Sequence, residues 1–401
     1  MLKYRYSCIC LVTFLAIAFN PKTLADSGST LEQAINQFED KISVVESQEG
    51  PYSERLSQQL VQLAVLFQQQ NKHQHAVKQL TRALHLTRVN EGLYSPSQID
   101  VLEQLIVSQK ALKKWKLVNN HMAYAYWLHT MNYAENTAQM IDITLKVANW
   151  SLKAYTLRIN EKPIDDLLTA HESFKRLSHL TSKEYGQHSL KVLDALHGQM
   201  ISNYLIGVSD PSQDGPADSL VYHEVSSMDM LRVQSFQRGL KIINQEIEIL
   251  LAQAKVNHMQ VVDAMLKLAD WNLMYGRPQS ATKQYKRAYQ YVQENDKENQ
   301  AYTNLFAKPV ALPKFPKLAL TSRERLTKQD IAANKKYVLA SFNVTRLGRV
   351  KQVKVLSANS EIKSATQNRI VRRLRYATFR PQLNLGSPVL TEEAQLHVYV
   401  D

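Results

Sequence analysis

Apolar residues recur with helical spacing along most of the chain between Asp26 and about Gln300. This stretch is rich in Leu, Ala, Gln and Lys and poor in Gly and Pro, a composition that favours one helix after another. The pattern also repeats with an offset of 42 residues. Leu60, Leu63, Ala64, Ala76, Leu80 and Ala83 correspond to Leu102, Leu105, Ile106, Val118, Met122 and Ala125. The repeat predicts an array of stacked helical pairs.

Small residues recur at fixed places within each unit. Large side chains at Ala64, Ala76 or Ala83 would push two antiparallel helices apart, so their spacing indicates close packing of a pair. The clearest single unit runs from Met265 to Ala288, with Gly276 in its turn. This spacing resembles the tetratricopeptide repeat in the 42-residue form of kinesin light chain. The resemblance implies an α-solenoid that binds protein partners.

The predicted array has weaker parts and interruptions. Between 134 and 206 we expect degenerate repeats, because Asp166 and Ser173 stand where alanines are expected, although Tyr185 to Ser189 resembles another repeat junction. A Pro- and Gly-containing segment, 207–227, is predicted to be a linker between two parts of the array, 26–206 and 228–294. A second linker, 295–316, is predicted to separate the array from a different kind of domain.

The last part of the chain, 317–401, shows strand patterns. Val338, Ala340, Phe342 and Val344 alternate with more polar neighbours, and Gly348 precedes a second β-branched run. A helical pattern follows from Glu361, and the chain ends in an alternating segment from Ala394 to Val400. The predicted order is β-β-α-β. The fold class expected for the whole chain is therefore mostly α, an α-solenoid followed by a small α+β domain.

This C-terminal pattern resembles the C-terminal domain of TonB, the energy transducer of the Gram-negative envelope. The matching residues are Gly348, Val350, Val353, Val355, Ser357, Arg372, Leu374, Arg375, Phe379, Arg380, Pro381, Gly386, Pro388 and Val389, and Phe315-Pro316 with Ala319 resembles the family's leading segment. The resemblance implies a docking domain whose last strand pairs with a short segment of an outer-membrane receptor. On that basis Gln395, His397 and Tyr399 are candidate partner-binding residues.

The first residues have the pattern of a secretory signal peptide. Lys3 and Arg5 precede an apolar run that ends at Phe19, and small residues stand before Asp26. We therefore expect residues 1–25 to be removed and the mature chain to have no stable transmembrane anchor. For an exported chain, the resemblance to the TonB C-terminal domain implies the periplasm as its compartment. Both cysteines, Cys8 and Cys10, would leave with this segment, so no disulfide or thiolate metal site is expected.

Positive charge is concentrated at the C-terminal end. The chain carries a net charge of +13, and residues 314–401 contain 17 basic and 6 acidic residues. Arg369, Arg372 and Arg375 share one side of the predicted helix. Nucleic acid is not expected as a partner of an exported protein, so the candidates are acidic partner segments or an anionic envelope surface. A basic face that only aids solubility is the alternative.

No catalytic motif is present. His171-Glu172 and His223-Glu224 are not followed by the second histidine of a zinc-protease motif, and no nucleophile elbow or phosphate-binding glycine loop occurs. The tryptophans lie at helical spacing and are predicted to be core residues rather than a ligand cage. We expect no enzyme activity, no metal and no cofactor.

Two functions fit these observations. The first is a protein-interaction scaffold or adaptor, with a TonB-like domain that docks an envelope partner, within a TonB-linked transport system. The alternative is an energy transducer of the TonB type that drives transport across the outer membrane. That family usually has an uncleaved N-terminal membrane helix and a Pro-rich spacer, and this chain shows neither, which favours the adaptor.

Overall fold

The computed structural model describes residues 23–135, 137–209, 222–295, 301–314 and 336–399. The chain divides into two compact units, 1–121 and 122–401, and each is described by itself. Most of the predicted signal peptide and the segment containing Phe315-Pro316 lie outside the described residues. Among the helices that are described, none is long and apolar enough to cross a bilayer.

The first unit confirms the 42-residue repeat. It contains α1 (Thr23–Glu49), α2 (Arg55–Gln69), α3 (His73–Glu91), α4 (Gln98–Ala111) and the start of α5 (Trp115–Asn132). The bounds of α2 and α3 recur about 42 residues later as those of α4 and α5. All twelve residues that correspond to one another at the 42-residue offset are buried. The tetratricopeptide-like packing predicted from small residues is therefore present, because Ala64, Ala76 and Ala83 leave no space for larger side chains.

The same glycine turn occurs at three junctions between helices. Gly50, Gly92 and Gly186 have φ values of 90°, 93° and 93°. Each donates its N–H to a carbonyl in the last turn of the preceding helix and accepts a hydrogen bond from the serine three residues later. A residue with a side chain would be strained at this φ. The junction predicted at Tyr185 to Ser189 is thus confirmed.

The helices of the second unit are the rest of α5, α6 (Ala138–Leu157), α7 (Pro163–Tyr185), a short 3-10 turn (Leu190–Val192), α8 (Leu193–Gly207), α9 (Tyr222–Leu251), α10 (His258–Met274), α11 (Pro278–Asn295) and α12 (Ala301–Phe306). From α6 to α11, each helix of the second unit packs against the next. Of residues 207–227, predicted as a linker, 210–221 lie outside the described residues, and 222–227 are helical, which contradicts the predicted boundary, because they form the start of α9. Helices α8 and α9 pack against each other. Asn203 also donates a hydrogen bond to the carbonyl of Ser235.

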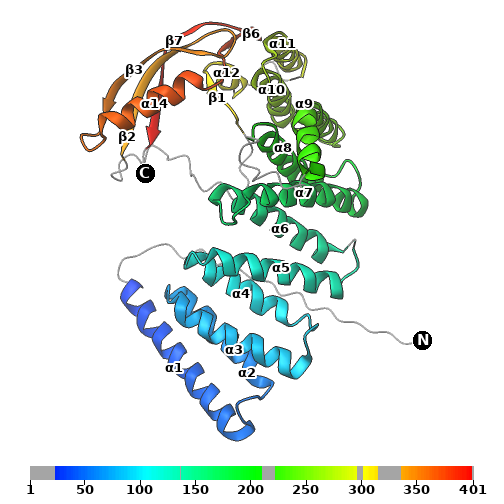
Figure 1. The fold of residues 1–401 in the computed structure, drawn as a ribbon, viewed down its shortest axis with the longest axis vertical. Helices are drawn as coiled ribbons and strands as arrows, with labels where there is room; N and C mark the ends of the chain where they lie inside the picture. The colour runs from blue at the N-terminus through cyan, green and yellow to red at the C-terminus, as the bar shows by residue number, and fades with distance from the viewer. Residues whose placement is uncertain (1–22, 136, 210–221, 296–300, 315–335, 400–401) are drawn as a thin grey trace. The chain divides into compact units, whose positions relative to one another are not determined.

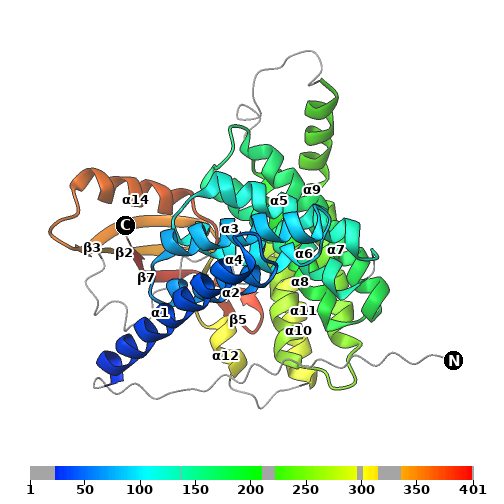
Figure 2. The same cartoon turned by 90° about the horizontal axis from the view of Figure 1, so that it is seen from below.

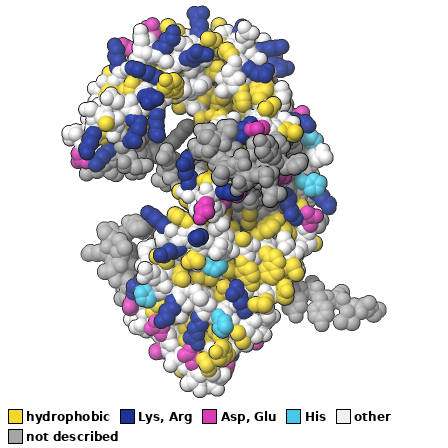
Figure 3. Space-filling model, viewed as in Figure 1, with side chains coloured by type: hydrophobic (Ala, Val, Ile, Leu, Met, Phe, Trp, Pro, Cys, Tyr) yellow, Lys and Arg dark blue, Asp and Glu magenta, His cyan; other side chains and the backbone are white. Residues whose placement is uncertain are grey.

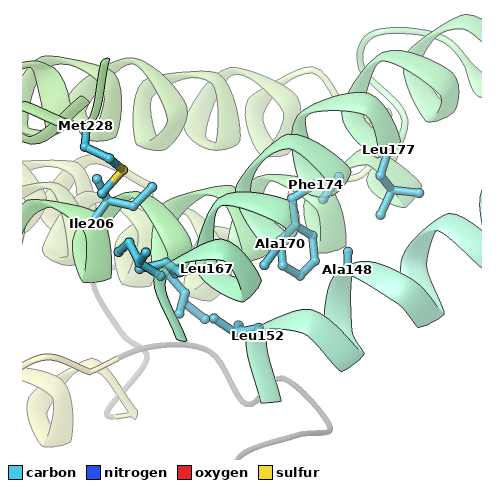
Figure 4. Packing of buried hydrophobic residues seen from close by; sticks show 11 residues of the cluster. Ala148, Leu152, Leu167, Ala170, Phe174, Leu177, Ile206 and Met228 are labelled. Atoms are coloured by element: carbon cyan, nitrogen blue, oxygen red, sulfur yellow. The ribbon is translucent and has the colours of Figure 1, made fainter. Parts of the chain in front are cut away.

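The degenerate repeats have a continuous core. Figure 4 shows Phe174 of α7 beside Ala148 of α6 and Ala170 of its own helix, within one cluster that also includes residues of α8 and α9. Phe174 also lies against Gly198 of α8, where no side chain can be accommodated. The unexpected Asp166 is buried and accepts a hydrogen bond from Asn160, and burial raises its pKa.

The C-terminal domain has the predicted order of elements. Its strands β2 (Tyr337–Val344), β3 (Val350–Ala358) and β7 (Thr391–Tyr399) form an antiparallel sheet in the order β3-β2-β7. Helix α14 (Ser364–Tyr376) lies across one face of this sheet (Figures 1 and 2). The alternating residues of β2, from Val338 to Val344, are buried against Ile370 and Leu374 of α14. The small α+β domain is therefore confirmed.

Two further strand pairs belong to this domain. Strand β1 (Val310–Ala311) pairs with β4 (Phe379–Arg380), and β5 (Leu383–Asn384) pairs with β6 (Ser387–Pro388). Leu385 and Gly386 between β5 and β6 both have positive φ, as a tight hairpin requires. Residues 295–316, predicted as a linker, thus contain α12 and β1.

The tryptophans are not all core residues. Trp150 and Trp271 are buried, as predicted, and the indole nitrogen of Trp271 donates a hydrogen bond to the carbonyl of Phe236. Trp127 is 38% exposed, which contradicts the prediction, and its ring stacks on Tyr124. Helical spacing indicates which residues share a face, but a wide face can extend beyond the buried stripe.

Replacing Gly198 with alanine should destabilise the second unit. Glycine in a helix interior usually costs about 1 kcal/mol relative to alanine. Here the new Cβ would lie 2.1 to 2.5 Å from three ring atoms of Phe174, and such overpacking costs about 1–3 kcal/mol. Urea denaturation measures the change. The Phe174→Leu substitution should relieve part of the loss, and a stabilising Gly198→Ala would contradict this packing.

Candidate functional site

A buried ion pair joins the C-terminal domain to the helical array. Arg380, in β4, reaches Asp270 of α10: its Nε lies 2.9 Å from Oδ1, and one terminal nitrogen lies 2.5 Å from Oδ2. The hydroxyl of Tyr285, in α11, donates to the same Oδ1 at 2.8 Å. The carboxylate is therefore bound by an arginine fork and a phenol from two other elements.

All three side chains are shielded from water. The exposed fraction is 2% for Arg380, 4% for Asp270 and 1% for Tyr285. Burial by itself would lower the pKa of Arg380, but the Asp270 carboxylate raises it above its ordinary value. Burial and the same carboxylate raise the pKa of Tyr285 well above its usual range. Arg380 therefore stays charged and Tyr285 stays a neutral donor.

Apolar contacts surround this ion pair. Leu383 of β5 belongs to the same buried cluster as Leu266 and Leu273 of α10 and Tyr302 and Phe306 of α12. The hairpin of β5 and β6 lies beside α11 (Figure 1), where a side chain at position 386 would collide with Tyr289. The C-terminal domain is thus fastened to the last helical pair by a buried surface.

The glycine turn between β2 and β3 is part of the same contact. Gly348 has a φ of 71°, and a Cβ there would lie 2.3 Å from the carbonyl oxygen of Phe379 and 2.9 Å from Leu273. The N–H of Phe379 donates to the carbonyl of Gly348. This glycine therefore allows the turn to approach both β4 and α10 closely.

One face of α10 is covered by these contacts. Asp263 and Asp270, seven residues apart, bind Lys314 and Arg380 respectively. Leu266 and Leu273 lie between and beyond them on the same helical face and belong to the shared cluster. The last helical pair therefore already holds a segment of its own chain along this face.

The predicted partner-binding residues lie on two separate surfaces. Arg369, Arg372 and Arg375 are exposed on α14, whose apolar face packs on the sheet. Gln395 and His397 are also exposed, and they alternate with residues of β7 that pack toward the helix, so they point to the other face of the sheet. The side chain of Tyr399 lies outside the described residues. The six residues do not form one site.

Strand β7 lies at an edge of the sheet. In the described part of the domain it pairs only with β2. Irregularities mark the pairing of β2 with both neighbours, at Gln352 of β3 and Glu393 of β7, which have positive φ. The amide of Asn343 binds both places: it donates to the side chain of Gln352 and accepts from the N–H of Glu393. This fixes the register at the edge strand.

Figure 3 shows Lys and Arg side chains spread over the part of the surface that α14 and its strands form. Arg373 of α14 and Lys351 and Lys354 of β3 are exposed in addition to the three predicted arginines. Among the described residues, the ion pair of Lys336 with Glu361 is one of the few contacts on this surface that offset the positive charge. The basic character predicted from the sequence is thus a property of the domain's exterior.

A second buried polar cluster lies within the array. Glu246 of α9 accepts hydrogen bonds from His197 at 2.9 Å and from Lys267 at 2.6 Å, all through Oε1. Burial alone would raise the pKa of Glu246, but His197 and Lys267 lower it below its ordinary value. These three groups pair with one another and so connect α8, α9 and α10. In the described residues, no group of three His, Cys, Asp or Glu side chains could hold a metal ion.

No family model matches the chain, and no curated protein matches it. Similar solved structures include a putative kinesin light chain from Podosopora anserina with nearly identical TPR-like repeats. One structure of that protein, a variant with a single substitution, is 12% identical, over 63% of this chain and 99% of that chain, with a TM-score of 0.41. A second structure of it is 13% identical, over 62% and 100%, with a TM-score of 0.40.

The BtubC (BKLC) protein of P. vanneervenii is 14% identical, over 68% of this chain and 92% of that chain, with a TM-score of 0.40. All three TM-scores lie below 0.5, so these likenesses are not used to assign the fold. The description of the array as tetratricopeptide-like therefore rests on its own repeated helix bounds and buried small residues.

The sequence carries one signal for the buried ion pair, which belongs to no known catalytic or metal-binding motif. Asp270 follows Leu268 and Ala269 in the clearest repeat unit and precedes Trp271, so a charged residue stands among apolar neighbours. Such a residue needs a partner when buried. Its partner is 110 residues away in the sequence, and no local pattern could identify it.

Breaking the buried ion pair should cost much more than breaking an exposed one. Arg380→Met leaves the Asp270 carboxylate buried without its charge partner, and the expected loss is about 3–5 kcal/mol in the free energy of unfolding. Adding Asp270→Leu should recover part of this loss, because no uncompensated charge remains. Urea denaturation of the single and double variants measures both effects.

Lys314→Met is the matched control. It removes the partly exposed pair with Asp263, for which a loss of at most about 1 kcal/mol is expected. Equal losses for Arg380→Met and Lys314→Met would show that burial of the Asp270 pair does not contribute to stability.

Proposed function

We propose that this protein is a non-enzymatic periplasmic scaffold whose C-terminal domain docks an extended segment of an envelope partner. The observation that carries the proposal is strand β7, which lies at the edge of a sheet that α14 covers on one face. An extended peptide can add to such an edge through main-chain hydrogen bonds. The sequence resemblance to the TonB C-terminal domain supports an outer-membrane protein as the partner.

The attachment of this domain to the array supports a scaffold role. The ion pair of Arg380 with Asp270 and the shared apolar cluster hold the edge strand on the last helical pair. A partner that binds β7 is therefore held in a definite position relative to α10 and α11. Helical arrays offer extended surfaces for protein partners, so one chain can bring two proteins together.

The exposed arginines of α14 support a second mode of attachment, to an anionic envelope surface. Arg369, Arg372 and Arg375 face away from the sheet. Attachment through these charges depends on salt, because the screening length falls to about 3 Å at 1 M ionic strength. Strand addition relies on main-chain hydrogen bonds and is much less sensitive. Salt therefore distinguishes the two modes.

A photoreactive amino acid at position 395 tests strand addition. Gln395 is exposed beside the edge, so crosslinking in envelope preparations should yield one outer-membrane protein. Irradiation in about 1 M salt should give the same product, because strand addition forms at that ionic strength. A photoreactive residue at position 372, on the opposite face of the domain, is the control and should not give this product. A product from position 372 alone, lost at high salt, would favour the anionic surface and contradict docking at β7.

The mature N-terminus distinguishes the scaffold from an energy transducer. Export with removal of the predicted signal peptide would give a chain that begins at Asp26 and is recovered without detergent. An energy transducer would keep Met1 and remain in the inner membrane. Mass spectrometry of the N-terminal peptide from soluble and membrane fractions measures this, and an intact Met1 in the inner membrane would overturn the periplasmic scaffold.

A further inference from the structure

A groove of about 440 Å³ lies over α10, between α9 and α11. Its floor is apolar: Phe236 of α9 and Leu268 of α10 are buried, and Leu240 of α9 lies beside them. The groove is on a different face of α10 from the one that holds the C-terminal domain. Leu268 and Asn272, four residues apart, lie on one side of the helix, and Asp270 and Leu273, three residues apart, lie on another. It is thus separate from both surfaces described above.

One wall of the groove is strongly basic. Ser280, Lys283, Gln284 and Arg287 follow one another at helical spacing along α11. Lys283 and Arg287 are exposed, and no acidic side chain lines the groove. In the part of the chain that the structure describes, neither cation forms an ion pair. Both charges are therefore available to a ligand.

A third cation stands at one end. The guanidinium of Arg277 lies over the ring of Phe236, 4.1 Å from its centroid. This contact orients the arginine against the apolar floor and leaves the edge of the guanidinium group for a carboxylate. Among described residues Arg277, like the two cations of α11, has no acidic partner.

The opposite wall carries amides. Gln237 and Asn244 of α9 are exposed there, and Gln284 faces them from α11. Side-chain amides both donate and accept, so they can bind the N–H and carbonyl groups of an extended main chain. From Phe236 to Asn244 the wall is about 12 Å long at about 1.5 Å per residue, which matches about four residues of extended peptide at about 3.3 Å each.

We propose that this groove binds an acidic peptide segment of a protein partner. The three cations take its carboxylates, the amides take its main chain, and Phe236, Leu240 and Leu268 take an apolar side chain. A free inorganic anion would use only the cations and would leave the apolar floor and the amide wall without a role. The site is independent of β7, so the scaffold would hold a second partner on the helical pair that carries the C-terminal domain.

Fluorescence anisotropy of the full-length protein with a labelled six-residue peptide of alternating leucine and glutamate tests the proposal. The double variant Lys283→Glu/Arg287→Glu should weaken binding at least ten-fold. The matched control is Lys241→Glu/Lys255→Glu, which changes the charge equally at exposed positions outside the groove and should weaken binding less than two-fold. Circular dichroism confirms that both variants remain folded.

Changing the peptide tests the floor. Replacing its leucines with serine should weaken binding, because the apolar contacts are lost while every charge remains. Equal losses for the two double variants would overturn the proposal, because they would show attraction to net charge alone. Displacement of the peptide by inorganic phosphate at low millimolar concentration, with no effect of the leucine changes, would also overturn it and indicate an anion site.

The protein with the photoreactive residue at position 395 separates this proposal from the docking function of β7. Position 395 lies outside the groove, so this protein should bind the labelled peptide with unchanged affinity. Failure to crosslink an outer-membrane protein with retained peptide binding would therefore contradict only the docking function, and crosslinking without peptide binding would contradict only the groove.

Discussion

The ion pair of Arg380 with Asp270 fixes the C-terminal domain to the last helical pair of the second unit. A charged pair removed from water is tolerated only when its hydrogen bonds are complete, and here the fork of Arg380 and the hydroxyl of Tyr285 both bind the carboxylate. Because the partners belong to β4, α10 and α11, the domain cannot leave the array without exposing a cluster of apolar residues and separating these charges. The C-terminal domain is consequently a fixed part of the last helical pair.

The fixed position of the C-terminal domain decides which of the nearby surfaces a partner can reach. One face of α10 is occupied by Arg380, Lys314 and the apolar residues that accompany them, so this part of the array is not available to a partner. Two other surfaces carry features that a partner could use: the edge strand β7, and the groove between α9 and α11. Both are held at fixed positions by the same helices. The two docking surfaces proposed above would therefore lie on the same part of the chain.

Small residues permit the close contacts on which the array depends. Gly198 admits the ring of Phe174 between α7 and α8, and Gly239 admits Trp271 between α9 and α10. In each case an aromatic ring fills space that a Cβ would take, which is how dense cores accommodate large side chains without voids. Gly348 has the same role where the C-terminal domain meets α10, but there the neighbours are a carbonyl group and Leu273.

The sequence by itself determined those features that repeat or alternate locally. The 42-residue offset located α2 to α5, because each helical pair buries the same small residues, and the alternation from Val338 to Val344 identified the buried face of β2. The exposure of Arg369 and Gln395 followed from the same periodicities. Only the tertiary structure decided how the two domains meet. Asp270 and Arg380 are 110 residues apart, and a pairing at that distance depends on the packing of α10, α11 and β4, which no local pattern of residues encodes. For the same reason the groove needed the structure: its walls come from α9 and α11, and each wall alone has the pattern of an ordinary polar helix face.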